Sequence, residues 1–358
     1  MHLSLVMPNL FTWDGDRLVT GGLERFALQL IDLAASLGYE VDVHQNADHN
    51  WRRSVQGVPV HGHGLARISP LAALEEIHQS TDHCLYLSIL QQPSVLRPDS
   101  IVVSHGVWWD APGTPVQDHL QICRDALTQA AEVVSVDYNF LNVMRAVLPD
   151  LAGKIRVIPN PVDVREFHPP RRRSGPATVL FPRRLDPARG ADLFLAAMAP
   201  ILEDDKGVRV IMAVDRNFPD RVEDLESRLR QSPFSGRVEL APTAFAEMAA
   251  IYRRADIAVI PSLYSEGTSL ACLEAMASGC AVVATDVGGL TNLVLSGHNG
   301  ILVRPEAKEL EAAVRHLLAD PDARQALRRS AAQSAAAFSL PRWRTAWAEA
   351  LKRVYKAP

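Results

Sequence analysis

Two glutamates eight positions apart, Glu266 and Glu274, are the residues of this chain whose type and spacing point most directly to chemistry. Between them, the run Gly267, Thr268, Ser269 and Leu270 reads as the start of a helix, and the apolar run before it, at 257–260, reads as a buried strand. The first N–H groups of a helix have no partner inside it, and its dipole places about half a positive charge there. We therefore expect the N–H groups of residues 267–270 to bind a diphosphate.

The spacing of the two carboxylates indicates what flanks that diphosphate. A rise of 1.5 Å per residue places them roughly 10–12 Å apart along a helix axis. One carboxylate could then hold a group on one side of the diphosphate, and the other a group on the opposite side. A sugar and a ribose joined by a diphosphate form a nucleotide sugar, so the pattern predicts a nucleotide-sugar site.

Composition limits the other classes of function. The chain has 358 residues, 47% hydrophobic and 22% charged, and a formal net charge of −4, so a nucleic-acid partner is not expected. No apolar run reaches the ~18 residues of a membrane span, and the first residues lack the basic region of a signal peptide. The four cysteines are widely spaced, as in a protein of a reducing compartment. We expect a cytoplasmic protein.

The elements that must position these residues alternate between strand and helix. In the first half, strands are predicted at 3–7, 39–43, 84–90, 101–104, 133–136 and 155–158, and a helix begins at Gly21-Gly22 and runs to about residue 37. In the second half, strands are predicted at 178–181, 208–214, 238–240, 257–260, 281–284 and 301–303. Alternation of this kind indicates parallel sheets with helices on both faces, an α/β fold.

A stretch rich in proline and basic residues, 168–176, interrupts the alternation and predicts a linker. It divides the chain into a first domain over 1–168 and a second over 177–339. Its basic triplet, 171–173, is expected to be solvated, with peripheral contact with anionic lipid at the inner membrane face as the alternative.

Three segments resemble one known family. Glu266 and Glu274 match the E-x7-E signature of the retaining glycosyltransferases of the GT-B fold, the group 1 or glycogen-synthase-like family. The segment 181–190, Phe-Pro-Arg-Arg-Leu-Asp-Pro-Ala-Arg-Gly, resembles the family's G-R-L-x-x-x-K-G, and 158–163, Ile-Pro-Asn-Pro-Val-Asp, resembles I-P-N-G-V-D. The departures are Arg183 and Pro161 in place of glycines, Arg189 in place of lysine, and Asn292 where the family's G-G-x-x-E has glutamate.

The resemblance implies a fold and a set of site residues. Two Rossmann-like doubly wound domains would face each other across a cleft, and a last helix at about 340–358 would pack back on the first domain. Arg184 and Arg189 would clasp the donor diphosphate and stabilise it as the leaving group. Gly21 and Gly22 would lie near the donor phosphates, His105 would contact the donor sugar, and Asn160 is a further candidate near the domain junction.

The resemblance also implies an activity. The protein would move a sugar from a nucleotide diphosphate sugar, with uridine or guanosine as the nucleoside, to a saccharide, lipid-linked or small-molecule acceptor, with retention of configuration. Biosynthesis of a cell-surface polysaccharide or a glycoconjugate is the expected setting. A front-face mechanism is implied, and nothing in the sequence separates it from a double displacement.

Two alternatives keep the same donor site: a nucleotide-sugar epimerase of this fold, and a binding protein without catalysis. A nicotinamide dehydrogenase is rejected because no G-x-G-x-x-G follows the first strand. A pyridoxal-dependent phosphorylase is discounted because none of the five lysines falls in a motif. Neither a metal nor another cofactor is expected, because turn chemistry explains the D-x-D pairs Asp14/Asp16 and Asp320/Asp322.

Overall fold

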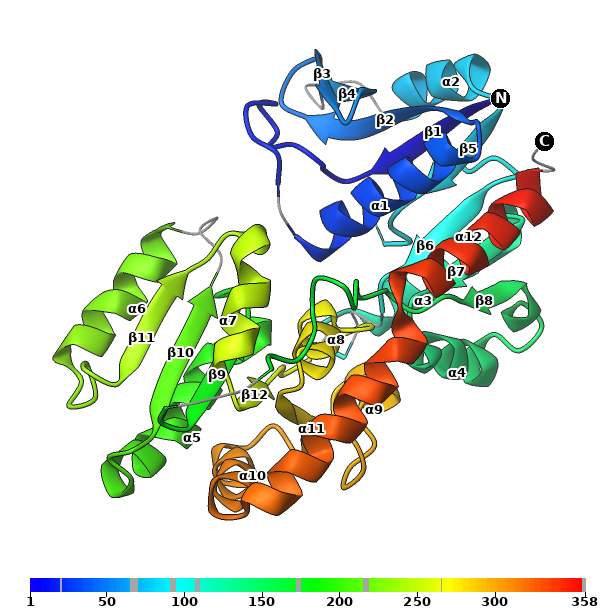
Figure 1. Cartoon of the computed structure of the whole chain (residues 1–358). Coiled ribbons are helices and arrows are strands. Elements are labelled where there is room, and N and C mark those ends of the chain that lie inside the picture. The colour runs from blue at the N-terminus through cyan, green and yellow to red at the C-terminus, as the bar shows by residue number, and fades with distance from the viewer. Residues whose placement is uncertain are drawn as a thin grey trace. The chain divides into compact units, whose positions relative to one another are not determined.

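The computed structural model describes residues 1–19, 21–64, 70–90, 95–106, 110–171, 175–214, 219–264 and 266–355, and of residues 70–74 the backbone alone. The chain forms two compact units (Figure 1): unit 1 comprises Met1–Pro159 and Trp343–Pro358, and unit 2 comprises Asn160–Arg342. The division therefore falls before Asn160 and not in the expected linker at 168–176. Asn160 and Val162 are held inside unit 2, because Asn160 hydrogen-bonds to Thr268 and Val162 forms a β-bridge with Ser339. Residues 172–174 of that linker lie outside the described residues.

Unit 1 is built on one sheet with the strand order β3-β4-β2-β1-β5-β6-β7-β8. Its strands are β1 (His2–Met7), β2 (Glu40–Ala47), β3 (Trp51–Val55), β4 (Val58–Gly64), β5 (His83–Tyr86), β6 (Ile101–Ser104), β7 (Glu132–Ser135) and β8 (Ile155–Val157). Every neighbouring pair runs parallel except β3 with β4. The order reverses between β1 and β5, the position where open α/β sheets bind ligands.

The hairpin of β3 and β4 was not expected from the sequence. Its two strands are joined by Gln56 and Gly57, whose φ angles of 51° and 80° are both positive. Positive φ at both central residues is the geometry of a type I′ turn, which suits the right-handed twist of the flanking strands. Gln is not a residue that usually signals this turn, so the hairpin could not be predicted from the residue types.

Helices cover both faces of the unit 1 sheet: α1 (Gly22–Ser36), α2 (Pro70–Ser80), α3 (Val116–Gln129), α4 (Tyr138–Val147) and, from the far end of the chain, α12 (Leu340–Tyr355), with a 3-10 turn at Ala152–Lys154. Phe26 of α1 contacts both Trp343 and Trp347 of α12, edge to face, at ring-centroid distances of 5.5 and 5.6 Å. From Trp343 onward, the last helix thus belongs to the unit formed by the first residues of the chain.

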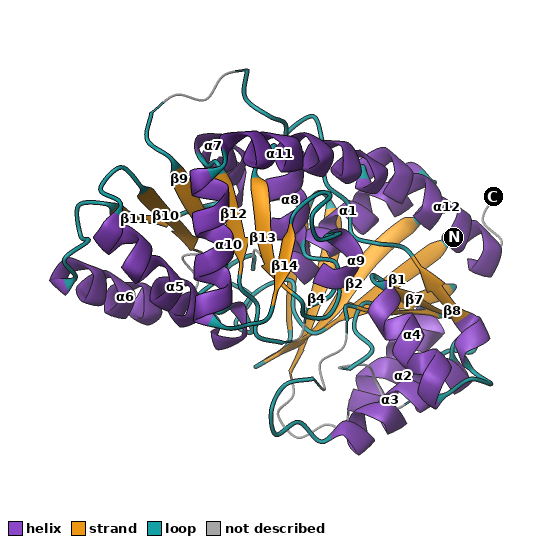
Figure 2. Ribbon diagram, turned by 90° about the horizontal axis from the view of Figure 1, so that it is seen from below, coloured by secondary structure: helices purple, strands orange, loops and turns teal. Residues whose placement is uncertain are grey.

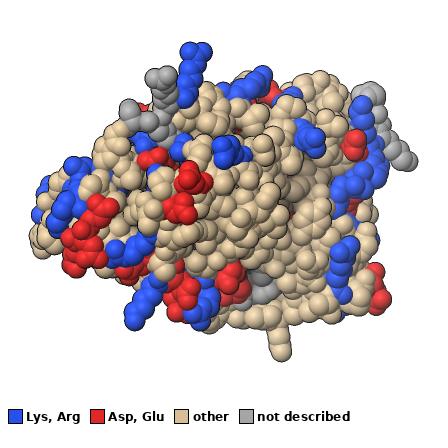
Figure 3. Space-filling view, turned by 60° about the horizontal axis from the view of Figure 1, so that its bottom comes forward, with Lys and Arg blue, Asp and Glu red and all other residues tan. Residues whose placement is uncertain are grey.

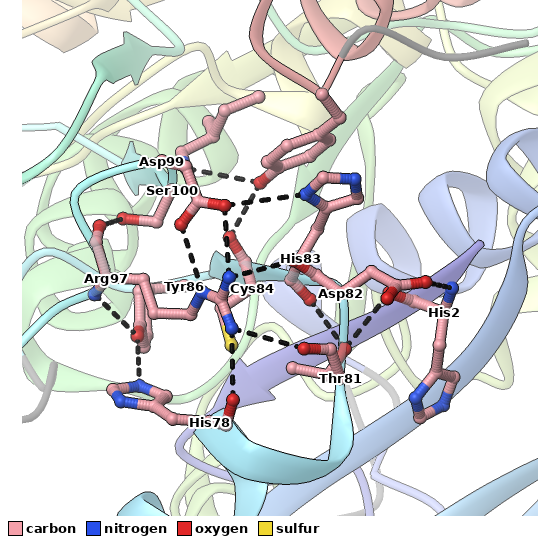
Figure 4. Close-up of polar contacts among 12 residues, drawn as sticks. His2, His78, Thr81, Asp82, His83, Cys84, Tyr86, Arg97, Asp99 and Ser100 are labelled. Atoms are coloured by element: carbon pink, nitrogen blue, oxygen red, sulfur yellow. Dashed lines mark hydrogen bonds and ion pairs between the residues drawn. The ribbon is translucent and has the colours of Figure 1, made fainter.

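The end of α12 is held by hydrogen bonds to the sheet. The hydroxyl of Tyr355 donates to the carbonyl of Cys84 at 2.6 Å and accepts from the amide of Ile101 at 3.2 Å. Beside it, Figure 4 shows the side chain of Arg97 donating to the backbone carbonyl of Thr81 and to the carboxylate of Asp99. Buried polar groups paired in this way fix the register of a helix on its sheet.

Unit 2 is built on a second sheet with the order β11-β10-β9-β12-β13-β14, in which every neighbouring pair runs parallel. Its strands are β9 (Thr178–Pro182), β10 (Arg209–Val214), β11 (Val238–Pro242), β12 (Ile257–Ile260), β13 (Ala281–Thr285) and β14 (Ile301–Val303). Its helices are α5 (Ala191–Asp204), α6 (Pro219–Gln231), α7 (Met248–Arg254), α8 (Leu270–Ala277), α9 (Leu290–Leu293), α10 (Ala307–Ala319) and α11 (Pro321–Ala335), with 3-10 turns at Pro187–Arg189, Phe245–Glu247 and Ala336–Phe338.

Both faces of the unit 2 sheet are buried, as Figure 2 shows by the helices that flank its strands. In β12, Ala258 and Ile260 pack into a core with α7, α8 and α11, while Ile257 and Val259 pack into the opposite core with α5, α6 and α10. Successive strand residues point to opposite faces, so a strand covered on both faces reads as a continuous apolar run. This burial explains why the run at 257–260 indicated a strand.

Candidate functional site

The carboxyl ends of β9 and β12 create the candidate site of unit 2. From β9 the chain runs outward through β10 and β11, and it then returns to the other side of β9 as β12. The strand order therefore reverses between β9 and β12, and such a reversal is the position at which open α/β sheets bind ligands. Arg183 follows β9 directly, and Ser262 and Glu266 follow β12.

Glu266 is the centre of a buried ionic cluster at this edge. Its Oε2 accepts from Arg183 at 2.5 Å, from Arg189 at 2.5 Å and from the hydroxyl of Ser262 at 2.6 Å. The residue is 6% exposed. Burial favours its neutral form, but the guanidiniums of Arg183 and Arg189 outweigh that effect and lower the pKa of Glu266 to about 2. The carboxylate is therefore ionised over the whole physiological pH range.

Arg183 is the residue of this cluster that sequence reasoning missed. Its Nη2 donates to Glu266 and to Ser262, and its Nη1 donates to the hydroxyl of Ser269 at 3.0 Å. It occupies the position where the resembled motif has glycine, which was the signal available in the sequence. Arg184, the expected partner of Arg189, is exposed and makes no hydrogen bond or ion pair with the described residues.

The helix start expected after Glu266 is present but begins later than the spacing estimate assumed. Ser269 is the N-cap of α8, and its side chain accepts from the amide of Cys272. Because α8 begins at Leu270, the residues from Glu266 to Ser269 are not helical, and the helical rise applies only to the part up to Glu274. Glu274 is 3% exposed and accepts from the hydroxyl of Tyr252 at 3.1 Å, a partner that the sequence did not indicate.

Backbone contacts hold the loop of Gly267 and Thr268 in place. Asn160 donates from Nδ2 to the carbonyl of Thr268 at 2.9 Å, and the amide of Gly289 donates to the carbonyl of Glu266 at 2.7 Å. A Cβ on Gly288, which has φ +50°, would lie 2.3 Å from the carbonyl oxygen of Glu266. The glycine pair at 288–289 therefore serves close packing of two backbones, and Asn160 supports the loop.

The expected residues of unit 1 lie at the carboxyl edge of its own sheet. Gly21 is the N-cap of α1 and Gly22 its first residue, and the first turn holds the buried Glu24, which accepts from Asn9 at 3.1 Å. His105 follows β6, its Nε2 lies 3.0 Å from the carbonyl of Leu87, and its ring contacts Phe26 edge to face. Burial lowers the pKa of His105 to about 4, so the ring is neutral at pH 7 and Nε2 carries the proton donated to Leu87.

The two D-x-D pairs have local structural roles. Asp14 accepts from the amide of Asp16 within a turn, at 3.0 Å, and Asp320 caps α11 by accepting from the amide of Ala323, at 2.9 Å. Within the described parts of the chain, no group of three or more His, Cys, Asp or Glu side chains is placed to hold a metal ion. The same parts contain no helix long and apolar enough to cross a membrane.

Comparison with known proteins finds a family similarity over the residues that contain this cluster. Residues 176–320 match the family model described as "Glycosyl transferases group 1". The chain is 30% identical over 253 residues to D-inositol 3-phosphate glycosyltransferase of Corynebacterium glutamicum, covering 64% of this chain and 59% of that protein. It is 35% identical over 191 residues to glycogen synthase of Mycobacterium tuberculosis, covering 52% and 44%. The chain spans about half the length of the curated relatives it matches.

Solved structures match over the whole length of the chain. Sucrose-phosphate synthase of Thermosynechococcus elongatus superposes with a TM-score of 0.80 at 19% identity, covering 100% of both chains. HepE of Anabaena in complex with UDP superposes with a TM-score of 0.75 at 19% identity, covering 99% of this chain and 100% of that one. These matches confirm the expected doubly wound α/β architecture. Residues 176–320 are therefore similar to the group 1 glycosyltransferases, and the whole chain has the GT-B fold.

Proposed function

We propose that this protein is a retaining glycosyltransferase that moves a sugar from a nucleotide diphosphate sugar to an acceptor hydroxyl. The observation that carries the proposal is the buried cluster of Arg183, Arg189 and Glu266 at the switch point of the unit 2 sheet, next to the start of α8. The domain that contains it matches the group 1 family. The structures of Anabaena HepE with UDP and with UDP-glucose support a nucleotide sugar as the donor.

In the proposed site, positive groups stabilise the diphosphate as it leaves. Arg189 lies in the cluster, and Arg184, which follows Arg183 in the chain, is exposed. Both would bind phosphate oxygens as the bond to the sugar breaks. The amides of residues 267–270 precede or open α8 and would add donors to the same charge. Arg183 acts as a positioning residue, because with Ser262 it holds the carboxylate of Glu266 in place.

Two further roles follow from burial and hydrogen bonding. Glu266 is ionised and would accept hydroxyl groups of the donor sugar, while Glu274 would accept the ribose hydroxyls. His105 is neutral and its Nε2–H donates to the carbonyl of Leu87, which leaves Nδ1 as an acceptor for a sugar hydroxyl. The acceptor is a saccharide, a lipid-linked sugar or a small molecule, and a cytoplasmic location with peripheral membrane contact fits that range. Uridine and guanosine diphosphate sugars are the first donors to examine.

Thermal unfolding in the presence of nucleotides tests the proposal. At one hundred times its Kd, a ligand stabilises the native state by about 2.7 kcal/mol, which raises the Tm of a domain of this size by roughly 5–10 °C. We expect such a rise with UDP-glucose or GDP-mannose, and a much smaller rise in the Arg189→Gln variant. Transfer to a panel of acceptors then follows, with the anomeric configuration of the product read by NMR.

The outcomes separate the candidate functions. Retained configuration supports the proposal, whereas an inverted product contradicts it. A changed sugar in the free nucleotide, formed without acceptor, would indicate an epimerase. Binding without any turnover over the acceptor panel would indicate a binding protein, and no stabilisation by any nucleotide sugar would remove the assignment altogether.

A further inference from the structure

A second charged site lies at the opposite edge of the unit 2 sheet. A cavity of about 920 Å³ is lined by residues that precede or open four parallel strands: 175–178 at β9, 209–211 at β10, 235–239 at β11, and Asp256 just before β12. The Arg183–Glu266 cluster follows the carboxyl ends of β9 and β12. The five residues of β9 separate the two edges by roughly 15 Å. The cavity is thus distinct from the candidate donor site.

The lining of this cavity is strongly basic. Six arginines and two carboxylates line it: Arg209, Arg237, Arg253, Arg254, Arg324, Arg328, Glu239 and Asp256. Figure 3 shows basic and acidic side chains interspersed over the face that it draws. In a chain whose net charge is −4, this local excess of positive charge is a property of the cavity and not of the protein as a whole.

Most of these guanidiniums are not neutralised by carboxylates. Arg254 pairs with Glu239, and Arg328 lies 3.9 Å from Asp256. The hydrogen bonds of the other four go to backbone carbonyls, which carry no formal charge. Arg253 donates to the carbonyl of Glu166 at 3.1 Å, and Arg209 donates to the carbonyls of Lys206 and Val208. Arg237 donates to the carbonyls of Leu202 and Asp205, and Arg324 donates to those of Leu317 and Leu318.

The same hydrogen bonds fix the guanidiniums before any ligand arrives. Arg237 and Arg324 bind carbonyls at the last turns of α5 and α10, which are the negative ends of these helices. Arg253 and Arg324 use only Nη1 in these contacts, so their Nε and Nη2 donors have no partner among the residues that the structure describes. A set of preordered cationic donors loses little conformational entropy on binding an anion.

We propose that this cavity is a binding site for a phosphate-bearing anion. Guanidinium forks match the geometry of phosphate oxygens, and they bind such oxygens in pairs. The volume is larger than one phosphate needs, so the site suits an anion with several phosphate groups, either free in solution or on a lipid headgroup. The proposal is independent of the proposed glycosyltransferase function, because it involves none of the residues of the Glu266 cluster.

Calorimetric titration with inorganic tripolyphosphate tests the proposal. We expect binding to the wild-type protein, with affinity that falls as salt rises, and a loss of at least about tenfold in each of Arg253→Gln and Arg324→Gln. Because these two side chains also hold backbone carbonyls, Arg209→Gln serves as a second variant; its side chain is exposed and its hydrogen bonds of 3.3 and 3.4 Å are long. The same direction of change is expected for it.

Two controls separate the cavity from other arginines. Arg230→Gln removes the same charge from an exposed position of α6 outside the cavity, and Arg189→Gln removes it from the candidate donor site. Arg230→Gln should bind tripolyphosphate like the wild type. Arg189→Gln should lose only binding at the candidate donor site and keep the binding that the cavity variants lose. The cavity variants should keep the thermal shift given by nucleotide sugars. Failure of the glycosyltransferase proposal would therefore leave the anion-site proposal intact, and failure of the anion-site proposal would leave the glycosyltransferase proposal intact.

A vesicle arm identifies the source of the anion. We expect one of two results with vesicles that contain phosphatidylinositol bisphosphate. If the protein sediments with them and tripolyphosphate releases it, the anion is a lipid headgroup; if it binds tripolyphosphate but does not sediment, the anion is free in solution. The proposal is overturned if the wild type does not bind tripolyphosphate, if the cavity variants bind it as the wild type does, or if Arg189→Gln abolishes the binding.

Discussion

Arg183 and Arg184 are neighbours that allow a matched experiment on the ionic cluster. Arg183 is buried and hydrogen-bonds to Glu266, Ser262 and Ser269, whereas Arg184 is exposed. Removing one partner of a buried ion pair costs about 3–5 kcal/mol. In Arg183→Gln, the Glu266 carboxylate keeps Arg189, so we expect the lower end, about 3 kcal/mol. In Arg184→Gln we expect a change within about 0.5 kcal/mol, as for an exposed site.

Urea unfolding followed by two signals shows whether this loss of stability occurs in unit 2. All six tryptophans of the chain lie in unit 1, so their fluorescence follows unit 1, while far-UV circular dichroism follows both units. With an m-value of about 3 kcal/mol/M, the loss of 3 kcal/mol lowers the midpoint of the unit 2 transition by about 1 M. We expect this shift in circular dichroism for Arg183→Gln, and no comparable shift for Arg184→Gln.

The pH dependence provides a second readout of the same cluster. The pKa of Glu266 is about 2 in the folded protein, below the ordinary value of 4.5 for a glutamate. Since the folded pKa is the lower one, its stabilisation is complete above pH 4.5 and is lost as the pH falls towards 2. Without Arg183, this acid-induced loss should become smaller. Equal midpoints for the two variants, or a shift confined to tryptophan fluorescence, would refute the reasoning about the cluster.

Three further predictions concern charge, backbone and pH. Glu266→Gln should leave UDP affinity undiminished in calorimetry, because the arginines lose their counter-charge, while turnover falls at least about a hundredfold. Gly288→Ala should destabilise the protein in urea by at least about 2 kcal/mol more than Gly297→Ala. Both glycines have positive φ, but a Cβ at Gly288 would meet a carbonyl oxygen, whereas a Cβ at Gly297 would meet nothing within 4 Å. Equal losses of stability in the two variants would contradict this prediction. Burial raises the pKa of Asp137, the N-cap of α4, to about 6, so its ionisation destabilises the fold as the pH rises from 4 to 6. Asp137→Asn should therefore stabilise unit 1 by about 2 kcal/mol at pH 7 and by little at pH 4, as measured by tryptophan fluorescence, and a constant difference would count against it.

Much of the sheet architecture could be predicted because burial on both faces leaves a direct trace in the sequence. The runs at 101–104 and 257–260 coincide with β6 and β12, whose residues are all buried. The hairpin of β3 and β4 left no such trace. In β3, Arg52, Arg53 and Ser54 are exposed, and Gln56 takes a positive φ that its residue type does not announce. The expected strand at 84–90 also ran past the end of β5 at Tyr86, because buried loop residues look the same as buried strand residues.

The position of the candidate site could be predicted from the sequence, but the side chains that bind Glu266 and Glu274 could not. A strand followed by small residues and a helix start placed Glu266 correctly at a strand end, since that pattern depends on local chain geometry. The choice between Arg183 and Arg184 depends on which side chain the backbone turns inward after β9, and a single sequence does not contain that information. Tyr252, the partner of Glu274, lies on another helix, so only the tertiary fold brings the two together.

The attachment of α12 to unit 1 has a consequence for synthesis on the ribosome. Tyr355 bonds to Cys84 and Ile101, 271 and 254 positions earlier in the chain. All of unit 2 must therefore be translated before the last piece of unit 1 exists, a delay of roughly 10–40 s at 5–20 residues per second. During that interval the aromatic surface around Phe26 lacks its two covering tryptophans. A nascent chain stalled before residue 340 should accordingly expose a chaperone-binding patch in its oldest part, while the younger part has already folded.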